Sequence, residues 1–145
     1  MIDKIDEKII KLLAKNGRIK LSDIAKEVNL SISPCQARLK KLEDQKYILG
    51  YHARVNYEKM QKAHVAFVQV VLSDSRETAL ENFNREVNKL ESVEQCHLIA
   101  GSFDYLLKVR TKNIQEYRIF FSEKISSLPH VASTSTFVSM ESVKD

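Results

Sequence analysis

The order of apolar patterns after residue 64 restricts this chain to very few folds. Residues 64–72 are rich in β-branched side chains and predict a strand. Five further elements follow in chain order: a helix marked by Leu80, Phe83, Val87 and Leu90, strands over 93–100 and 103–110, a helix over 114–128 that ends before Pro129, and a strand over 131–140. This β-α-β-β-α-β order predicts a four-stranded antiparallel sheet with both helices on one face, the ferredoxin-like arrangement.

The other face of this sheet is expected to need a partner. The strands carry apolar residues at both parities, for example Phe67 beside Val68 and Leu106 beside Leu107. The chain's own helices cover only one face, so the second apolar face requires another subunit. We therefore expect a homodimer.

Residues 3–42 show a different periodicity, that of three short helices. Ile5, Ile9, Leu12 and Leu13 form one apolar stripe, which ends at Asn16-Gly17, where glycine is free to adopt a positive φ. A second helix covers about 21–28, and Asn29 is suited to a left-handed residue in the turn that follows. Ser31 is a candidate N-cap of a third helix. A short helix, a tight turn and a second helix indicate a helix-turn-helix.

The third helix has the composition expected of a DNA-recognition helix. Cys35, Leu39 and Leu42 form its inward stripe. A solvated helix with scattered charges is the simpler interpretation, but it does not explain why short polar side chains are followed by a basic stretch. Such a layout places small or amide groups at base edges and cations at phosphates. The candidate DNA-binding residues are Ser31, Ser33, Gln36, Ala37, Arg38, Lys40 and Lys41, with the last three at phosphates.

The charge of the chain is unevenly distributed. The 145 residues carry a net charge of +4, and residues 1–60 hold 13 Lys/Arg against 8 Asp/Glu. The remaining residues hold 10 against 11, so the basic charge lies entirely in the front part. A basic front module and a nearly neutral second module suggest that the first one faces double-stranded DNA.

The segment after the third helix is expected to connect the two modules. Residues 47–56 have β character with a break at Gly50, and they predict either a small wing hairpin or a strand that leads out of the module. Residues 57–63 are polar and are the best hinge candidate. The predicted organisation is a DNA-binding domain over 1–50, a linker strand or hinge over 51–63, and a sensing and oligomerisation domain over 64–145.

Several classes of function are disfavoured. The four histidines are dispersed, and no Gly-rich phosphate loop, GxSxG or HExxH is present, so no catalytic residue is expected and the chain is not predicted to be an enzyme. Cys35 and Cys96 lack CxxC spacing, so neither a metal site nor a disulfide is expected. The absence of a long apolar run and of a signal peptide predicts a cytoplasmic protein with no membrane contact.

The whole chain resembles the Lrp/AsnC family, the leucine-responsive or feast/famine transcriptional regulators. The resemblance covers residues 2–143 and rests on several short stretches in a fixed order. These are Ile5-Asp6, Gly17-Arg18-Ile19, Leu30-Ser31, Pro34-Cys35, Arg38-Leu39, Leu42-Glu43, Gly50-Tyr51, Glu94 to Leu98, Gly101, Phe103 to Lys108, and Met140-Glu141 with Val143-Lys144. The chain departs from the family pattern at Ser102, where an acid is frequent, and at Lys46, where a glycine is common.

The resemblance implies an α+β protein, with an N-terminal winged helix-turn-helix followed by a ferredoxin-like βαββαβ effector and oligomerisation domain. It also implies assembly of dimers into larger particles, commonly octamers. No cofactor is implied, but a free amino acid would bind between subunits at Gly101, Ser102, Phe103, Asp104 and Tyr105. From the residues alone, Gly101 offers backbone amides to a carboxylate and Asp104 a carboxylate to an ammonium group, although this stretch can equally be a plain hairpin turn capped by Asp104. A rival function is an amino-acid sensor that mainly assembles with related regulators and binds little DNA.

Overall fold

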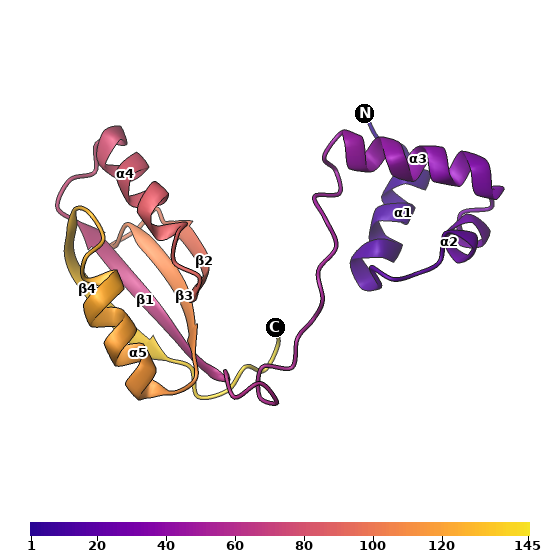
Figure 1. The fold of residues 1–145 in the computed structure, drawn as a ribbon. Helices are drawn as coiled ribbons and strands as arrows, with labels where there is room; N and C mark the ends of the chain where they lie inside the picture. The colour runs from indigo at the N-terminus through magenta and orange to yellow at the C-terminus, as the bar shows by residue number, and fades with distance from the viewer. The chain divides into compact units, whose positions relative to one another are not determined.

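The computed structural model describes residues 1–145 and divides them into two compact units, Met1–Val55 and Asn56–Asp145 (Figure 1). The first unit holds three helices: α1 (Lys4–Lys15), α2 (Leu21–Glu27) and α3 (Ile32–Asp44). The second holds β1 (His64–Leu72), α4 (Glu77–Val87), β2 (Val93–Leu98), β3 (Tyr105–Thr111), α5 (Ile114–Phe120) with a following π-helical turn (Phe121–Ile125), and β4 (Val131–Val138). This order confirms the predicted α+β fold class. No helix is both long and apolar enough to cross a bilayer.

The first helix begins at a reciprocal cap. The Asp3 carboxylate accepts hydrogen bonds from the backbone N–H groups of Ile5 and Asp6, both at 2.9 Å, and the Asp6 carboxylate accepts one from the Asp3 N–H at 3.1 Å. Amides at a helix start lack intrahelical acceptors, so this exchange satisfies three of them. The cap fixes both carboxylates at the N-terminus of α1.

The turn between α2 and α3 confirms the prediction for Asn29. Its φ is 56°, in the left-handed region. The N–H of Asn29 donates to the Lys26 carbonyl at 3.2 Å, and the N–H of Leu30 donates to the Ala25 carbonyl at 2.9 Å. These two bonds close α2 as a Schellman motif, which directs the chain straight into the next helix.

The end of α3 uses the same motif with a less usual residue. Lys46 has a φ of 63°, and the N–H of Tyr47 donates to the Leu42 carbonyl at 2.9 Å. The family that this chain resembles often has a glycine at this position, and the backbone conformation explains why: L-residues with a side chain are disfavoured there. Lysine nevertheless adopts it, and its own N–H makes the second closing bond, to the Glu43 carbonyl at 3.0 Å.

The structure differs from two local expectations about the first unit. Gly17 does not have a positive φ, since no glycine of the chain does, and α1 ends instead at Asn16 in an extended conformation. Residues 47–56 form no hairpin, because all four strands of the chain lie after residue 63 and none is available to pair with them. The chain runs out of the unit without forming a strand, so the other alternative, a strand that leads out of the module, is not confirmed either. On its way, the Tyr51 hydroxyl donates to the Glu43 carboxylate at 2.7 Å, and burial together with this bond raises the pKa of Tyr51 to about 12.

The core of the first unit joins all three helices. Its buried apolar side chains are Ile9, Leu13, Ile24, Ala25, Val28, Cys35 and Leu42. Ile9, Cys35 and Leu42 are almost completely inaccessible to solvent. Since each helix is too short to be stable alone, this shared core is what holds α3 in place.

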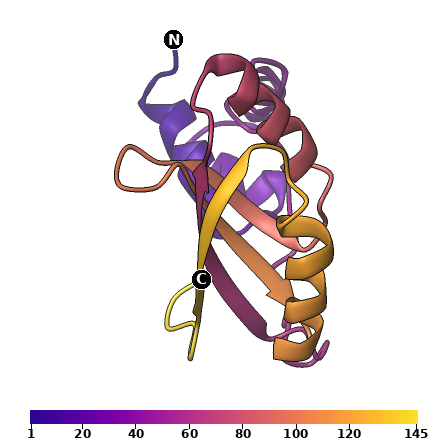
Figure 2. The ribbon, with the colours of Figure 1, turned by 90° about the vertical axis from the view of Figure 1, so that its left-hand side faces the viewer.

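The sheet of the second unit has the strand order β2-β3-β1-β4, with every neighbouring pair antiparallel. Figure 2 shows α4 and α5 on the same side of this sheet. The arrangement confirms the predicted ferredoxin-like topology. The predicted second helix does not continue regularly to residue 128, because it widens into the π-helical turn, in which the N–H of Ser126 donates to the Phe121 carbonyl five residues earlier.

The two faces of this sheet differ in burial. Val68 and Leu107 lie opposite each other in the β1–β3 register and are fully buried under the helices. Phe67 pairs with Phe137 of β4 and faces the other side, where 54% of Phe137 is exposed. The sheet therefore has one covered apolar face and one partly open face that carries aromatic side chains.

Candidate nucleic-acid interface and effector loop

Six of the seven predicted DNA-binding residues lie on the exposed surface of the first unit. Ser31, Ser33, Gln36, Ala37, Lys40 and Lys41 are exposed, whereas Cys35 and Leu42 on the same stretch are buried. Positions 33, 36, 37 and 40 recur at helical spacing and so share one face of α3. Ser31 occupies the N-cap position as predicted, but its side chain makes no capping hydrogen bond. The polar face of α3 is thus available to a ligand along its length.

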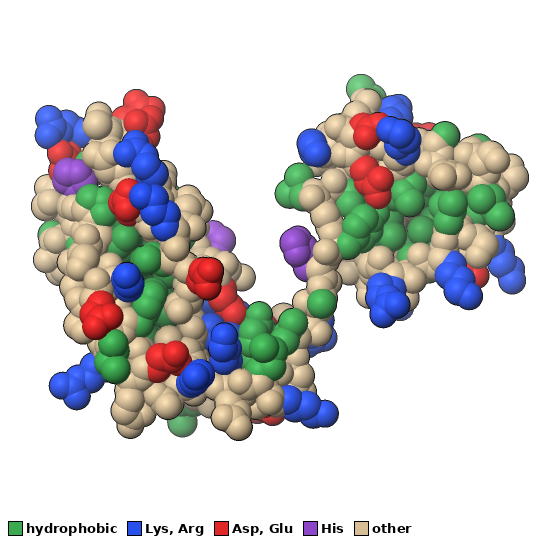
Figure 3. Space-filling view, viewed as in Figure 1, with side chains coloured by type: hydrophobic (Ala, Val, Ile, Leu, Met, Phe, Trp, Pro, Cys, Tyr) green, Lys and Arg blue, Asp and Glu red, His purple; other side chains and the backbone are tan.

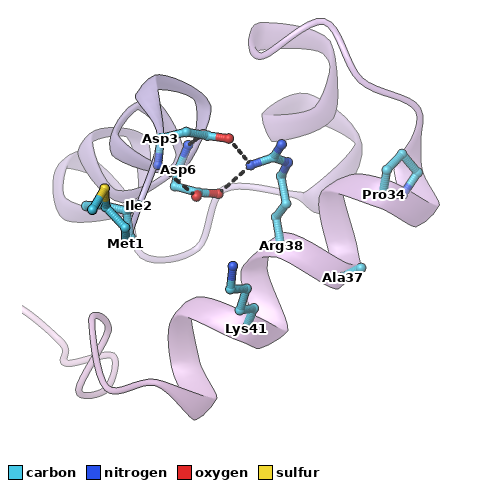
Figure 4. A pocket seen from close by; sticks show the side chains of 8 residues that line it. All are labelled: Met1, Ile2, Asp3, Asp6, Pro34, Ala37, Arg38 and Lys41. Atoms are coloured by element: carbon cyan, nitrogen blue, oxygen red, sulfur yellow. Dashed lines mark hydrogen bonds and ion pairs between the residues drawn. The ribbon is translucent and has the colours of Figure 1, made fainter.

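The two lysines of α3 differ in their partners. Lys40 donates to the Asp44 carboxylate at 2.7 Å, with 73% and 62% of the two side chains exposed. This hydrogen bond raises the pKa of Lys40. An exposed pair one helical turn apart contributes little stability, so Lys40 can exchange Asp44 for a phosphate at small cost. Lys41 lines one pocket together with Ala37 and Pro34 of the same helix (Figure 4).

Arg38 is placed differently from the other predicted residues. Its Nη1 lies 2.7 Å from Asp3 Oδ2 and 2.8 Å from Asp6 Oδ1, so the guanidinium bridges both carboxylates of the α1 cap (Figure 4). The backbone N–H of Asp6 and then the guanidinium hold the pKa of Asp3 below its usual value, and the two carboxylates raise the pKa of Arg38. Sequence reasoning missed this contact. Its only signal is the Asp-x-x-Asp spacing of a capping box.

Acidic side chains lie close to the cations of this unit. Figure 3 shows basic and acidic side chains side by side along its α3 edge. The acidic residues that α3 itself contributes are Glu43 and Asp44, both in its last turn. The first turn of α3 carries no acid, so Ser33 and Gln36 offer hydrogen-bonding groups, and Ala37 a small apolar one, with no acid on the helix beside them.

The predicted effector stretch is a loop that is hydrogen-bonded to β1. The Asp104 carboxylate accepts from the Leu72 N–H at 2.7 Å, the Asp104 N–H donates to the Val70 carbonyl at 2.9 Å, and the Ile99 N–H donates to the Asp104 carbonyl at 2.8 Å. Gly101 and Ser102 are exposed at the tip, while Phe103 and Asp104 are half-buried. Asp104 therefore fixes the loop to the end of β1, whatever else it binds.

Tyr105 does not share the environment of the loop tip. It is only 2% exposed, its ring stacks on Phe83 at a centroid distance of 4.3 Å, and its hydroxyl donates to Asn84 Oδ1 at 2.7 Å. Burial raises its pKa. The structure thus brings Gly101 to Asp104 together and places the Tyr105 side chain between the sheet and α4.

A charged network at the other end of the β2–β3 hairpin escaped sequence reasoning. Arg110 forms an ion pair with Glu94 and lies 3.9 Å from the centre of the Tyr57 ring. Its neighbour Lys108 lies 2.7 Å from Asp145 Oδ1. Because these partners are far apart in sequence, no local pattern signals them. The network attaches the start of the second unit to its sheet.

The structure contains no group of three or more His, Cys, Asp or Glu side chains that could hold a metal ion. Both cysteines are free thiols; Cys35 is buried and Cys96 is partly so. Burial raises the pKa of both thiols, that of Cys96 to about 11. Neither side chain resembles an activated nucleophile, which would need a lowered pKa.

Comparison with known proteins matches each of the two units to a known domain family. A family model of winged helix-turn-helix DNA-binding domains matches residues 2–48, and a model of the Lrp/AsnC ligand-binding domain matches residues 65–145. The chain is 54% identical over 144 residues to the proline dehydrogenase transcriptional activator of Rhizobium radiobacter, covering 99% of this chain and 92% of that protein. It is 41% identical over 143 residues to the leucine-responsive regulatory protein of Escherichia coli K12, covering 99% of this chain and 87% of the relative.

A solved structure agrees with these relatives. The transcriptional regulator of Neisseria meningitidis in complex with L-Met superimposes with a TM-score of 0.91 at 30% identity, covering 100% of this chain and 94% of that one. The relatives are transcriptional regulators and not enzymes, as predicted. The exposed polar face of α3 and the loop at the end of β1 therefore belong to a chain that has the same fold as this regulator. The chain therefore belongs to the Lrp/AsnC family of DNA-binding transcriptional regulators that carry an amino-acid-binding domain.

Proposed function

We propose that this regulator activates transcription of a proline dehydrogenase gene and that an amino acid controls it. The names of relatives that are 54% and 46% identical over nearly the whole chain support the choice of target. An enzyme that degrades proline is needed only when proline is present, so proline is the first effector to test. Leucine and methionine, named for other relatives, are the alternatives. The protein would act in the cytoplasm, where it reaches DNA.

The observation that carries the proposal is the exposed face of α3. In this proposal Ser31, Ser33, Gln36 and Ala37 face base edges in the major groove, and Lys40 and Lys41 neutralise phosphates. Short side chains at positions 33 and 37 permit close approach of the helix backbone to the bases, and Gln36 can form a two-bond contact with adenine. Arg38, the seventh predicted DNA-binding residue, lies on the same helix but contacts Asp3 and Asp6.

Assembly is the second part of the proposal. A dimer would form through the open sheet face, on which Phe137 is 54% exposed. Residues 51–60 would add to the contact, since Tyr51, Val55 and Met60 expose 47%, 40% and 53% of their surface. Such a dimer presents two copies of α3 to half-sites about one helical turn apart or a multiple of it. Further assembly, as an octamer, would increase avidity without new DNA contacts.

The effector would bind between subunits at the 101–104 loop. Gly101 and Ser102 are exposed and offer backbone N–H groups to a carboxylate. Asp104 would receive the ammonium group with the oxygen that does not accept from Leu72. Residues 51–63 are proposed as the linker through which assembly state and DNA binding are coupled, with a coupling free energy of about 1–3 kcal/mol.

Two experiments test the proposal. The first is a thermal-shift screen against the twenty amino acids, because a ligand that binds only the folded state raises the melting temperature. Proline is expected to do so; stabilisation by another amino acid alone would refute proline as effector, and no stabilisation by any of them would refute amino-acid control.

The second experiment is a mobility-shift titration with DNA from upstream of the proline dehydrogenase gene. Specific retardation that changes on addition of the stabilising amino acid is expected. Binding no tighter than to unrelated DNA would remove this gene as the target and favour a sensor that acts through assembly with related regulators.

A further inference from the structure

Among the cations of α3, Arg38 is the only one that already contacts two carboxylates of the same chain. Its guanidinium reaches Asp3 Oδ2 and Asp6 Oδ1 at 2.7 and 2.8 Å through one nitrogen, Nη1 (Figure 4). Its side chain is 32% exposed, against 73% for Lys40. A phosphate-binding arginine would present its guanidinium to solvent, and this one is turned towards α1.

The two carboxylates divide their oxygens between two tasks. Asp3 uses Oδ1 for the helix cap and Oδ2 for Arg38, while Asp6 uses Oδ2 for the cap and Oδ1 for Arg38. The cap of α1 and the middle of α3 are therefore one hydrogen-bonded unit. A tilt of α3 relative to α1 would break bonds at both ends of this unit, whereas rotation of Lys40 would break only its exposed bond to Asp44.

Burial makes the link hard to open. The Asp6 side chain is only 8% exposed, and a carboxylate with so little water around it requires a cation or several hydrogen-bond donors. Movement of Arg38 to a DNA phosphate would leave Asp6 without its cation. The exposed Lys40–Asp44 pair carries no such penalty, because both of its members can be hydrated.

We propose that Arg38 is a positioning residue: it sets the orientation of α3 on α1 through Asp3 and Asp6, and it does not neutralise a DNA phosphate. This role rests on the proposed use of α3 as the recognition helix. The phosphate contacts of α3 then come from Lys40 and Lys41. Orientation matters for base-edge contacts, which demand a defined helix angle, more than for phosphate contacts, which flexible lysines follow.

The test measures the affinity of each variant for two DNA duplexes and the salt dependence of that affinity. An operator duplex is selected by the wild-type full-length chain from a random-sequence pool, and a scrambled duplex of equal length serves as the non-specific partner. Affinity for each is measured from low to high salt, because every neutralised phosphate contributes about 0.9 to the slope of log K against log [salt]. Melting curves establish that each variant is folded at the assay temperature.

For Arg38→Ala we expect a loss of about tenfold in operator affinity, the size of one good base contact, with little change on the scrambled duplex and an unchanged salt slope. Equal losses on both duplexes together with a slope smaller by about 0.9 per protomer would overturn the proposal, because Arg38 would then bind a phosphate. An unchanged ratio of operator to scrambled affinity would also overturn it, since Arg38 would then contribute to folding alone.

Two milder variants decide the matter if Arg38→Ala does not fold. Asp6→Asn removes the more buried of the two carboxylates that hold Arg38, so a phosphate-binding Arg38 would be held less tightly and DNA binding would tighten with a steeper slope. The positioning role predicts weaker operator binding at the same slope. Arg38→Lys keeps the charge but its side chain is one atom shorter, so the ammonium should reach the two carboxylates less well. Operator affinity should then fall between those of wild type and Asp6→Asn; wild-type affinity would overturn the proposal.

Lys41→Ala is the matched control on the same helix. It should weaken binding to both duplexes and reduce the slope by about 0.9 per protomer. If it changes neither, α3 does not lie at the phosphates and the proposed recognition helix is wrong, whatever the result at Arg38. The two failures are therefore distinguishable.

Discussion

Asp104 is predicted to have two separable roles, and two substitutions can separate them. Its carboxylate accepts from the Leu72 N–H at 2.7 Å, which holds the 101–104 loop against β1. The same carboxylate is the proposed ammonium site for the effector. Asp104→Ala removes both functions, whereas Asp104→Asn keeps an acceptor oxygen for Leu72 and removes only the charge.

The expected loss of stability follows from this bond. A hydrogen bond to a charged group contributes about 1.5–3 kcal/mol, and Asp104 is half-buried, so about 1.5 kcal/mol is appropriate for Asp104→Ala. For a unit of about 90 residues this lowers the melting temperature by about 6–12 °C. Asp104→Asn replaces a charged bond by a neutral one, at a cost of roughly 0.5 kcal/mol or about 2–4 °C.

The expected loss of response is larger and is shared by both variants. An effector at a hundredfold excess over its Kd stabilises the wild-type fold by about 2.7 kcal/mol. Loss of an ammonium–carboxylate bond of about 2–3 kcal/mol raises the Kd roughly 30- to 150-fold. The stabilisation by the same concentration of effector then falls below about 1 kcal/mol.

The assay is a thermal-shift titration of wild type, both variants and the control Glu91→Gln with the stabilising amino acid. Glu91 is an exposed acid in the turn between α4 and β2, so its neutralisation should alter neither the melting temperature nor the response. A wild-type response in Asp104→Asn would refute the ammonium site. A wild-type melting temperature in Asp104→Ala would refute the structural value assigned to the Leu72 bond.

Three further outcomes are expected. Phe137→Asp places a charge on the open sheet face opposite Phe67, so sedimentation should show dissociation of the assembly; an unchanged mass would contradict the proposed interface. Bonds from Arg76 lower the pKa of Asp74 from 3.8 to about 2. The ionised carboxylate therefore stabilises the fold above about pH 4, and this stability is lost as the pH falls through 2. The difference in urea midpoint between wild type and Asp74→Asn should shrink over that interval. Burial raises the pKa of Cys96 from 9.0 to about 11, which leaves about a hundredfold less thiolate at pH 8, so mass spectrometry should find alkylation by iodoacetamide much slower in the native protein than in urea.

The sequence predicted those elements whose signal is local. Strand β1 was predicted over 64–72, the bounds it has in the structure, because nine successive residues of high β propensity lie between polar segments. Asn29 was placed correctly in the left-handed region because few other residue types adopt it. Gly17 does not adopt the positive φ that is open to it, because glycine permits this conformation but does not require it.

Contacts between distant residues were beyond the reach of sequence patterns. Arg38 looked like one of three equivalent cations, and nothing near it in the chain distinguishes it from Lys40. Its partners lie 35 and 32 positions away, and they meet it only because the core around Ile9 and Cys35 packs α1 against α3. Tyr105 was likewise grouped with Gly101 by adjacency, whereas the pleat of β3 directs its side chain away to Phe83.

The sequence by itself determined the order of the elements, the ferredoxin-like topology and the exposed polar face of α3, because hydrophobic periodicity and short-range turn chemistry act between neighbours along the chain. Tertiary structure decided which charged side chains already contact an opposite charge or a hydrogen-bond donor within the chain, and which remain able to bind a ligand. Arg38 is held by two carboxylates, and Asp104 is bonded to Leu72, while Lys40 holds only an exposed acid that water can replace. The physical reason is that the interaction energy of a charged group depends on its burial and on the groups packed against it. Both are properties of three-dimensional packing and not of sequence order.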